Sequence, residues 1–197
     1  MSGPHGKARS KCRGWLYFCY LVLIVRFWTG RKRSVPAVTL GFVKLTHVDE
    51  RGAARMVDVS AKDVTVRTAH AQGRFVTNPE VIALLRGEGL PKGDALAVAR
   101  IAGLAGAKRT PDLVPLCHPV ALHAVSVDLD VRDNCVVIDA TTRTADRTGV
   151  EMEALTAVVA AGLALYDMVK AVDRAAQLTD VRLLAKAGGR SGEWTRG

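Results

Sequence analysis

The clearest repeating pattern along the chain is the alternation of apolar and polar residues from Val125 to Val131. A period of two predicts a strand with one buried face. Asp133-Asn134 then predicts a hairpin turn, and Cys135 to Thr142 the strand that returns beside the first. Shorter stretches predict three more strands, at Met56 to Val59, Val64 to Val76 and Val181 to Lys186.

Three segments carry helix signals. Asn78-Pro79-Glu80 predicts a helix that starts with Asn78 as its N-cap and runs to Arg86. A second helix is expected from near Asp94 to Arg109, rich in alanine and glycine, which let another element approach closely. A third, long and amphipathic, is expected from Gly149 to Val172.

From Val64 onwards the predicted order is strand, helix, strand, strand, helix, strand. This order predicts an α+β fold, a ferredoxin-like sandwich in which the helices lie on one face of an antiparallel sheet. The other face of the sheet must also be covered. In a domain of this size a second subunit can cover it, so we expect an oligomer.

Positive charge is confined to the start of the chain. The 197 residues include 28 lysines and arginines and 19 acidic residues, which gives a formal charge of +9. Residues 1–44 hold nine of these bases and no acid, so residues 45–197 carry no net formal charge. A neutral domain gives no reason to expect nucleic acid or a membrane as its partner.

The same 44 residues contain an unbroken apolar run, Trp15 to Val25. A helix needs about 20 residues to span the hydrocarbon of a membrane, and no small-residue cleavage site follows, as it would in a signal peptide. Two interpretations stay open: a weak membrane-surface anchor, or upstream sequence outside a native protein that starts between Val35 and Val43. We favour the second, and expect residues 1–44 to lie outside the fold and residues 45–197 to form one domain.

The four cysteines form no CxxC pair, so neither a disulfide framework nor a thiolate zinc site is indicated, and a reducing cytoplasm is the expected setting. A metal site built from Cys117, His118 and His123 is disfavoured, because adjacent ligands seldom both point inward. Cys117 is more simply a small core residue than a nucleophile. We therefore expect no metal and no resident cofactor.

Six runs place polar groups within apolar sequence. They are MVDVSAK at 56–62, KGDALAVARIAG at 92–103, LVPLCHP at 113–119, TGVEMEALTAV at 148–158, YDMVKA at 166–171 and LLAKAGGRSG at 183–192. In this order they resemble the MoaC family, the cyclic pyranopterin monophosphate synthases, over about residues 45–194. Six long runs in sequence are far more specific than one short motif.

The resemblance implies a lyase-type enzyme of molybdenum cofactor (molybdopterin) biosynthesis that converts a cyclised dihydro-GTP to the cyclic pterin and releases diphosphate. Asp167 would be the principal acid or base, with Lys170 and Lys92 as further catalytic residues. The implied substrate-binding residues are Arg67, Leu116, Cys117, His118, Met152, Glu153 and Lys186. The chemistry needs cations for a triphosphate and placed proton donors and acceptors for the rings, and the sequence supplies both.

Two of these assignments have plainer alternatives. Asp167 and Lys170 are three residues apart, so on a helix they could form an ordinary surface ion pair. Their apolar neighbours, such as Leu165 and Val169, instead favour a pair in an apolar setting with shifted pKa values. His118 is as easily explained as a buried structural histidine as a catalytic one.

Helix geometry points to a site shared between chains. Glu153 and Asp167 lie fourteen residues apart on the predicted helix, or about 21 Å at 1.5 Å per residue. One small substrate cannot easily contact both from one chain. We expect a dimer at least, and the resemblance implies a hexamer built as a trimer of dimers.

Two other classes of function compete with the enzyme. Ferredoxin-like domains can serve as non-catalytic ligand-binding modules, because a fold alone does not fix a function. Glu151, Glu153 and Asp167 within an apolar helix speak against a sensor, which has less need of acid and base groups. A nucleic-acid binder acting through the basic first 44 residues has no support from the neutral domain.

Overall fold

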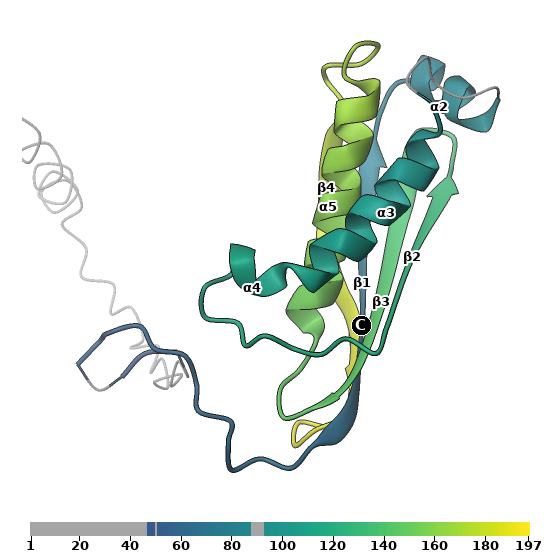
Figure 1. Cartoon of the computed structure of the whole chain (residues 1–197). Helices are drawn as coiled ribbons and strands as arrows, with labels where there is room; N and C mark the ends of the chain where they lie inside the picture. Colours follow the sequence, from purple (N-terminus) through teal and green to yellow (C-terminus); the bar gives the residue numbers. More distant parts are fainter. Residues whose placement is uncertain (1–46, 50, 88–92) are drawn as a thin grey trace, which may run out of the picture. The chain divides into compact units, whose positions relative to one another are not determined.

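The computed structural model of the chain describes residues 47–49, 51–87 and 93–197 (Figure 1). Within them lie five strands and four helices. In chain order these are β1 (Thr65–Val76), α2 (Pro79–Arg86), α3 (Ala95–Lys108), α4 (Thr110–Leu113), β2 (Ala124–Val131), β3 (Cys135–Asp146), α5 (Glu151–Val169), β4 (Gln177–Ala187) and β5 (Trp194–Thr195).

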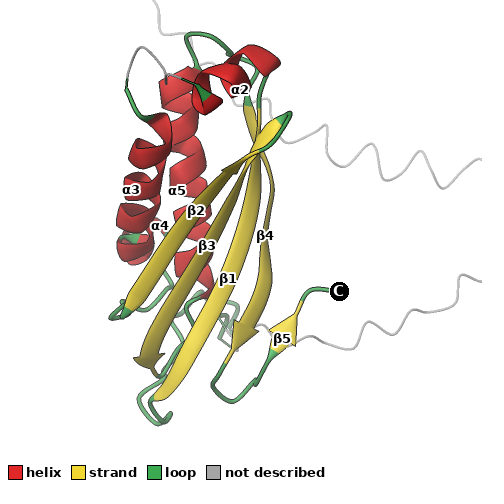
Figure 2. Ribbon diagram, turned by 90° about the vertical axis from the view of Figure 1, so that its right-hand side faces the viewer, coloured by secondary structure: helices red, strands yellow, loops and turns green. Residues whose placement is uncertain are grey.

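The strands form one antiparallel sheet in the order β2-β3-β1-β4-β5. The two long helices α3 and α5 lie on one face of this sheet (Figure 2). The expectation of an α+β fold with an antiparallel sheet is therefore confirmed. The core lies between these two layers and includes Phe75, Ile138 and Leu165, all fully buried.

Small residues bring α3 against α5, as the alanines and glycines of the sequence predicted. A Cβ atom on Gly103 would lie 3.0 Å from the carbonyl oxygen of Ala157 and 3.0 Å from the side chain of Val127. A Cβ atom on Gly106 would meet Ala160 at 2.5 Å. Larger side chains at these two positions would push the helices apart and disturb the close-packed core.

The seven main elements match the prediction within a few residues at each end, but one predicted strand is wrong. Residues 56–59 are irregular and partly exposed, and they pair with no strand in the described part of the chain. Four residues of alternation are too few to fix a strand that has no partner. The long helix also ends at Val169 rather than Val172, and the sequence did not predict α4 or β5.

Helix α5 has the length and apolar composition of a membrane-spanning helix. A core helix of a globular domain has the same properties. Here Ala154, Val158, Leu165 and Val169 are fully buried against the domain, so the apolar composition of α5 is explained by the core.

Candidate functional site

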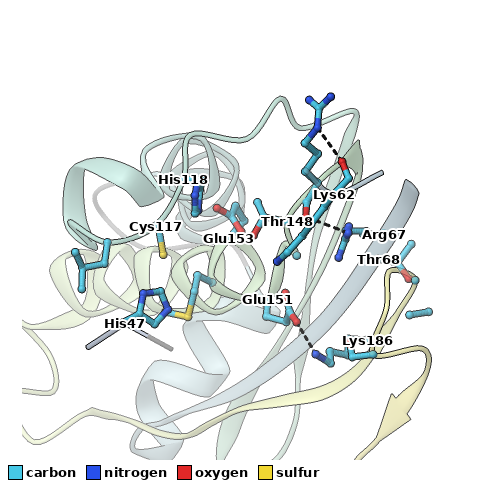
Figure 3. A pocket seen from close by; sticks show the side chains of 17 residues that line it. His47, Lys62, Arg67, Thr68, Cys117, His118, Thr148, Glu151, Glu153 and Lys186 are labelled. Carbon is cyan, nitrogen blue, oxygen red and sulfur yellow. Dashed lines mark hydrogen bonds and ion pairs between the residues drawn. The ribbon is translucent and has the colours of Figure 1, made fainter. Parts of the chain in front are cut away.

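A cavity of about 420 Å³ lies where the amino end of α5, the start of β1 and the end of β4 meet the loop after α4 (Figure 3). All seven residues that the sequence predicted as substrate-binding line it: Arg67, Leu116, Cys117, His118, Met152, Glu153 and Lys186. They come from three elements and one loop that are far apart in the sequence. Their roles remain a prediction, but the structure brings them together.

Arg67 is held in place by backbone oxygens. Its Nε donates to the carbonyl oxygen of Asp146 at 2.9 Å, and one Nη donates to that of Arg147 at 3.1 Å. Gly189, with φ of +69°, runs so close that a Cβ atom there would collide with the Arg67 guanidinium. Arg67 therefore shapes one wall of the cavity by joining β1 to the loop that follows β3.

An ion pair fixes one edge of the cavity. Lys186 Nζ lies 2.9 Å from Glu151 Oε1, and both side chains are mostly buried. Figure 3 shows this pair across the space between β4 and the start of α5. From the sequence, Glu151 was noted only as one of the acids of the apolar helix and was not predicted to bind substrate.

The carboxyl group of Glu153 is buried at the amino end of α5, which disfavours its ionised form. Only 3% of Glu153 is exposed. Burial raises the pKa of Glu153 above its ordinary value, and the negative charge of Glu151 adds to this shift. A protonated carboxyl can donate a hydrogen bond or a proton to a group bound in the cavity, which an ionised one cannot.

Cys117 is unsuited to act as a nucleophile. Burial raises the pKa of its thiol, and the charge of Glu153 raises it further. The reactive form of a cysteine is the thiolate, and this environment disfavours it. Cys117 therefore lines the cavity as a small neutral side chain.

His118 has a structural contact as well as a place in the cavity. Its Nε2 lies 2.7 Å from the carbonyl oxygen of Val57, and because a carbonyl can only accept, Nε2 must donate. This bond holds the irregular segment 56–59 beside the cavity. The two interpretations of His118 are thus compatible: the ring is anchored through Nε2 and borders the cavity.

The structure places Asp167 and Lys170 away from this cavity, in the last turn of α5. Lys170 Nζ lies 2.6 Å from Asp167 Oδ1, and the side chains are 51% and 63% exposed. The expectation of an apolar setting is therefore wrong. The hydrogen bond and the charge of Asp167 raise the pKa of Lys170, so it stays protonated.

A second cavity of about 410 Å³ lies beside this pair and is lined by Tyr166, Lys170, Ala171 and Arg174. Along α5 the distance from Glu153 to Asp167 is about 21 Å. The chain therefore presents two separate clusters of predicted site residues. Lys92, the third predicted catalytic residue, lies outside the described residues.

The first cavity also contains cations that the sequence reasoning missed. Lys62 lines it and makes no ion pair within the described part of the chain. Arg147 also lines it, and its Nε donates to the carbonyl oxygen of Lys62 at 2.9 Å, which fixes the backbone there. Lys62 belongs to the run MVDVSAK, so the signal was present in the sequence.

No group of three histidine, cysteine or acidic side chains that could hold a metal ion occurs among residues 47–49, 51–87 and 93–197. His123 accepts a hydrogen bond from the backbone of Ala145 instead.

Residues 56–189 match the sequence model of the MoaC family. The chain is 67% identical over 153 residues to the cyclic pyranopterin monophosphate synthase of Streptomyces coelicolor, covering 78% of this chain and 90% of that protein. It is 64% identical over 156 residues to the enzyme of the same name from Nocardioides sp., covering 78% and 96%. It is 59% identical over 153 residues to cyclic pyranopterin monophosphate synthase 2 of Mycobacterium tuberculosis, covering 78% and 92%.

Proposed function

The chain belongs to the MoaC family, and from this premise we propose how its residues divide the work of a cyclic pyranopterin monophosphate synthase. The enzyme acts in molybdenum cofactor biosynthesis, where it converts cyclised dihydro-GTP to cyclic pyranopterin monophosphate and releases diphosphate. The first cavity carries the proposal, because it joins a cationic side to a side with a buried carboxyl group. A nucleotide-derived substrate matches this arrangement, because it has anionic phosphates at one end and a ring system at the other.

The phosphates bind on the cationic side of the cavity. Lys62, Arg67 and Lys186 line it there, next to the backbone of Gly188. Glu151 neutralises part of the charge of Lys186, whereas no described acid pairs with Lys62. Charged donors of this kind bind phosphate oxygens by charge-assisted hydrogen bonds.

The purine-derived ring system binds on the other side. Leu116, Cys117 and Met152 supply its contact surface, and Glu153, whose pKa is raised by burial, supplies a proton to the ring. His118 keeps the wall of this side in place through its bond to Val57. The ring is then held while its bonds are rearranged.

Asp167 and Lys170 act in this cavity from a neighbouring copy of the chain, and Lys92 is a further catalytic residue. The separation along α5 supports this, since one chain presents its two clusters far apart. We propose a homo-oligomer, with a dimer as the smallest active unit and a hexamer as a trimer of dimers. Exposed apolar side chains on α3 and α5 support a partner: Ile101 is 66% and Leu163 64% exposed.

Three finer assignments belong to the same proposal. The strand order β2-β3-β1-β4 supports a ferredoxin-like arrangement of the catalytic domain. That domain is residues 45–197, and the first 44 residues take no part in catalysis. The location is the cytoplasm, in keeping with the free cysteines Cys117 and Cys135.

Turnover of the cyclised dihydro-GTP tests the proposed function. The full chain is incubated with this compound, and diphosphate and the fluorescent oxidation product of the pterin are measured over time. We expect the two products in equal amounts. A protein that binds the compound tightly but releases no diphosphate would instead be the non-catalytic ligand-binding module.

Glu153→Gln separates stability from catalysis. Because the pKa of Glu153 is raised, its ionisation destabilises the fold, and this penalty grows as the pH rises above the ordinary glutamic acid pKa of about 4.3. The free energy of unfolding of the variant should therefore rise relative to that of wild type as the pH is raised from 4.5 to 8. Its turnover should fall about tenfold to a hundredfold, because glutamine cannot donate the proton.

Thermal unfolding at the two pH values and steady-state kinetics measure both effects. A variant whose advantage shrinks with rising pH would show that Glu153 is ionised at little cost. This result would contradict the proposed role of Glu153 as a proton donor.

A further inference from the structure

Asp173 is a buried carboxylate that the site described above does not use. It is 8% exposed, and among the described residues only Glu153 is a carboxylic acid as well buried. It lines neither of the two cavities. A charged group is costly to bury unless its hydrogen bonds are satisfied, so its partners show what it holds together.

The partners of Asp173 come from two segments. The hydroxyl of Thr77 donates to Oδ2 at 2.8 Å, and the backbone N–H of Asn78 donates to the same oxygen at 2.9 Å. The N–H of Ala175 donates to Oδ1 at 2.9 Å. Asp173 forms no ion pair with any described cation, so the network is directional rather than a simple attraction of charges.

This network ties the end of α5 to the junction between β1 and α2, and the two lie together at one end of the α+β domain (Figure 1). Thr77 and Asn78 form that junction, and the Asn78 side chain also accepts from Val81 N at 2.9 Å, which caps α2. Asp173 follows Lys170 by only three residues. The turn that leaves α5 is thus fixed from outside the helix.

The last turn of α5 needs such an anchor, because helix ends fray and open locally unless they are held. Lys170 is the C-cap residue of α5, and the ion pair that it makes with Asp167 lies in solvent. One further contact helps: the Tyr166 hydroxyl donates to the carbonyl oxygen of Arg174 at 3.3 Å. The Asp173 network and the Tyr166 bond together hold residues 171–176 against the rest of the domain.

We propose that Asp173 is a positioning residue that fixes the end of α5 and so holds Asp167 and Lys170 in their reacting geometry. The inference rests on the proposed function of this pair. Asp173 itself touches no substrate and acts through the backbone of the turn. The hydroxyl of Thr77 and the amides of Asn78, Ala175 and Ala176 lower the pKa of Asp173, so the anchor is ionised at neutral pH.

Four variants in the full-length protein test this role. Asp173→Ala removes the anchor, and we expect kcat to fall about tenfold to a hundredfold with KM within about threefold, since a shift of about 1 Å in a catalytic group has effects of this size. Asp173→Asn keeps an acceptor and should recover part of the loss. Thr77→Val removes one donor and should lower kcat in the same direction, by less.

Thr110→Val is the matched control. Thr110 is fully buried, and its hydroxyl donates to the carbonyl oxygen of Ala107 at 3.0 Å, so the change removes a comparable buried hydrogen bond at the end of α3. We expect it to lower Tm as Thr77→Val does and to leave kcat unchanged. If Asp173→Ala does not fold, the pair Thr77→Val and Thr110→Val carries the test.

Amide hydrogen exchange gives a readout that does not depend on turnover. The amides of Lys170 and Asp173 donate within the end of α5, to Tyr166 and Val169. These amides should exchange at least tenfold faster in Asp173→Ala than in wild type. In Thr110→Val their exchange rates should equal those of wild type. If the wild-type protein shows no turnover, the result contradicts the proposed function and not the anchoring of α5 by Asp173. Active wild type with unchanged kcat and unchanged exchange in Asp173→Ala, or in Thr77→Val where that pair carries the test, would overturn the positioning role.

Discussion

Asp167→Asn is expected to lower turnover by about a thousandfold, the size of effect typical for the loss of a general acid or base. The substitution keeps the size of the side chain and its capacity for hydrogen bonds but removes the group that takes or gives the proton. The fold should be intact, because Asp167 is 63% exposed and exposed ion pairs add little to stability. Steady-state turnover, with circular dichroism and thermal unfolding for the fold, checks both parts.

Asp130→Asn is a matched control for this experiment. Asp130 forms an ion pair with Arg132 at 2.8 Å, and its side chain is also 63% exposed. It lies at the far edge of the sheet in β2 and lines neither cavity. Its loss should leave turnover unchanged. Near-normal turnover of Asp167→Asn would instead make Asp167 the partner in an ordinary surface ion pair.

The elements with a regular pattern were predictable from the sequence, because side chains repeat with the period of the backbone. The alternation from Val125 to Val131 gave β2, and the capping signals at Asn78 gave the start of α2. Strand β3 extends further than predicted, to Asp146. Its last part hides Thr142 and Thr144 in the core, where their hydroxyls donate to the carbonyl oxygens of Val150 and Ala121. Polar residues with such internal partners look like solvent-facing residues in a sequence.

The setting of the Asp167–Lys170 pair could not be read from its neighbours in the chain. Leu165 and Val169 are fully buried, and they lie on the face of α5 that meets the sheet. Asp167 and Lys170 lie on another face of the same helix. Helical geometry therefore separates residues that are adjacent in sequence, and an apolar stretch does not make an apolar environment.

Local sequence patterns could not reveal which residues meet in the candidate site either. The cavity residues named from the sequence came from the family resemblance, and no spacing rule would have assembled them from three elements and a loop. Contacts over long separations in the chain leave no local pattern at all. Thr77 and Asp173 are 96 residues apart, and only the folded chain shows that they meet.

A site built from two chains makes a second strong prediction. Lys186→Ala disables the cavity, and Lys170→Ala disables the end of α5; each protein alone should lose about a hundredfold or more of its activity. In a mixed dimer, one site receives both defects and the other receives neither. After dissociation and random reassembly of equal amounts, about a quarter of the sites should be wild type.

A second mixture controls for this recovery. Lys170→Ala and Asp167→Asn both alter the end of α5, so in a mixed dimer each of the two sites still receives one defect. Reassembly of this pair should restore nothing. Any general gain from the mixing procedure itself would appear in both mixtures.

The activity of the reassembled Lys186→Ala and Lys170→Ala mixture, measured as diphosphate released from the cyclised dihydro-GTP, tests the shared site most directly. The predicted result is about a quarter of wild-type activity in this mixture and only parental activity in the control mixture. Parental activity in both, with mass analysis confirming mixed oligomers, would place both lysines in a site formed by one chain.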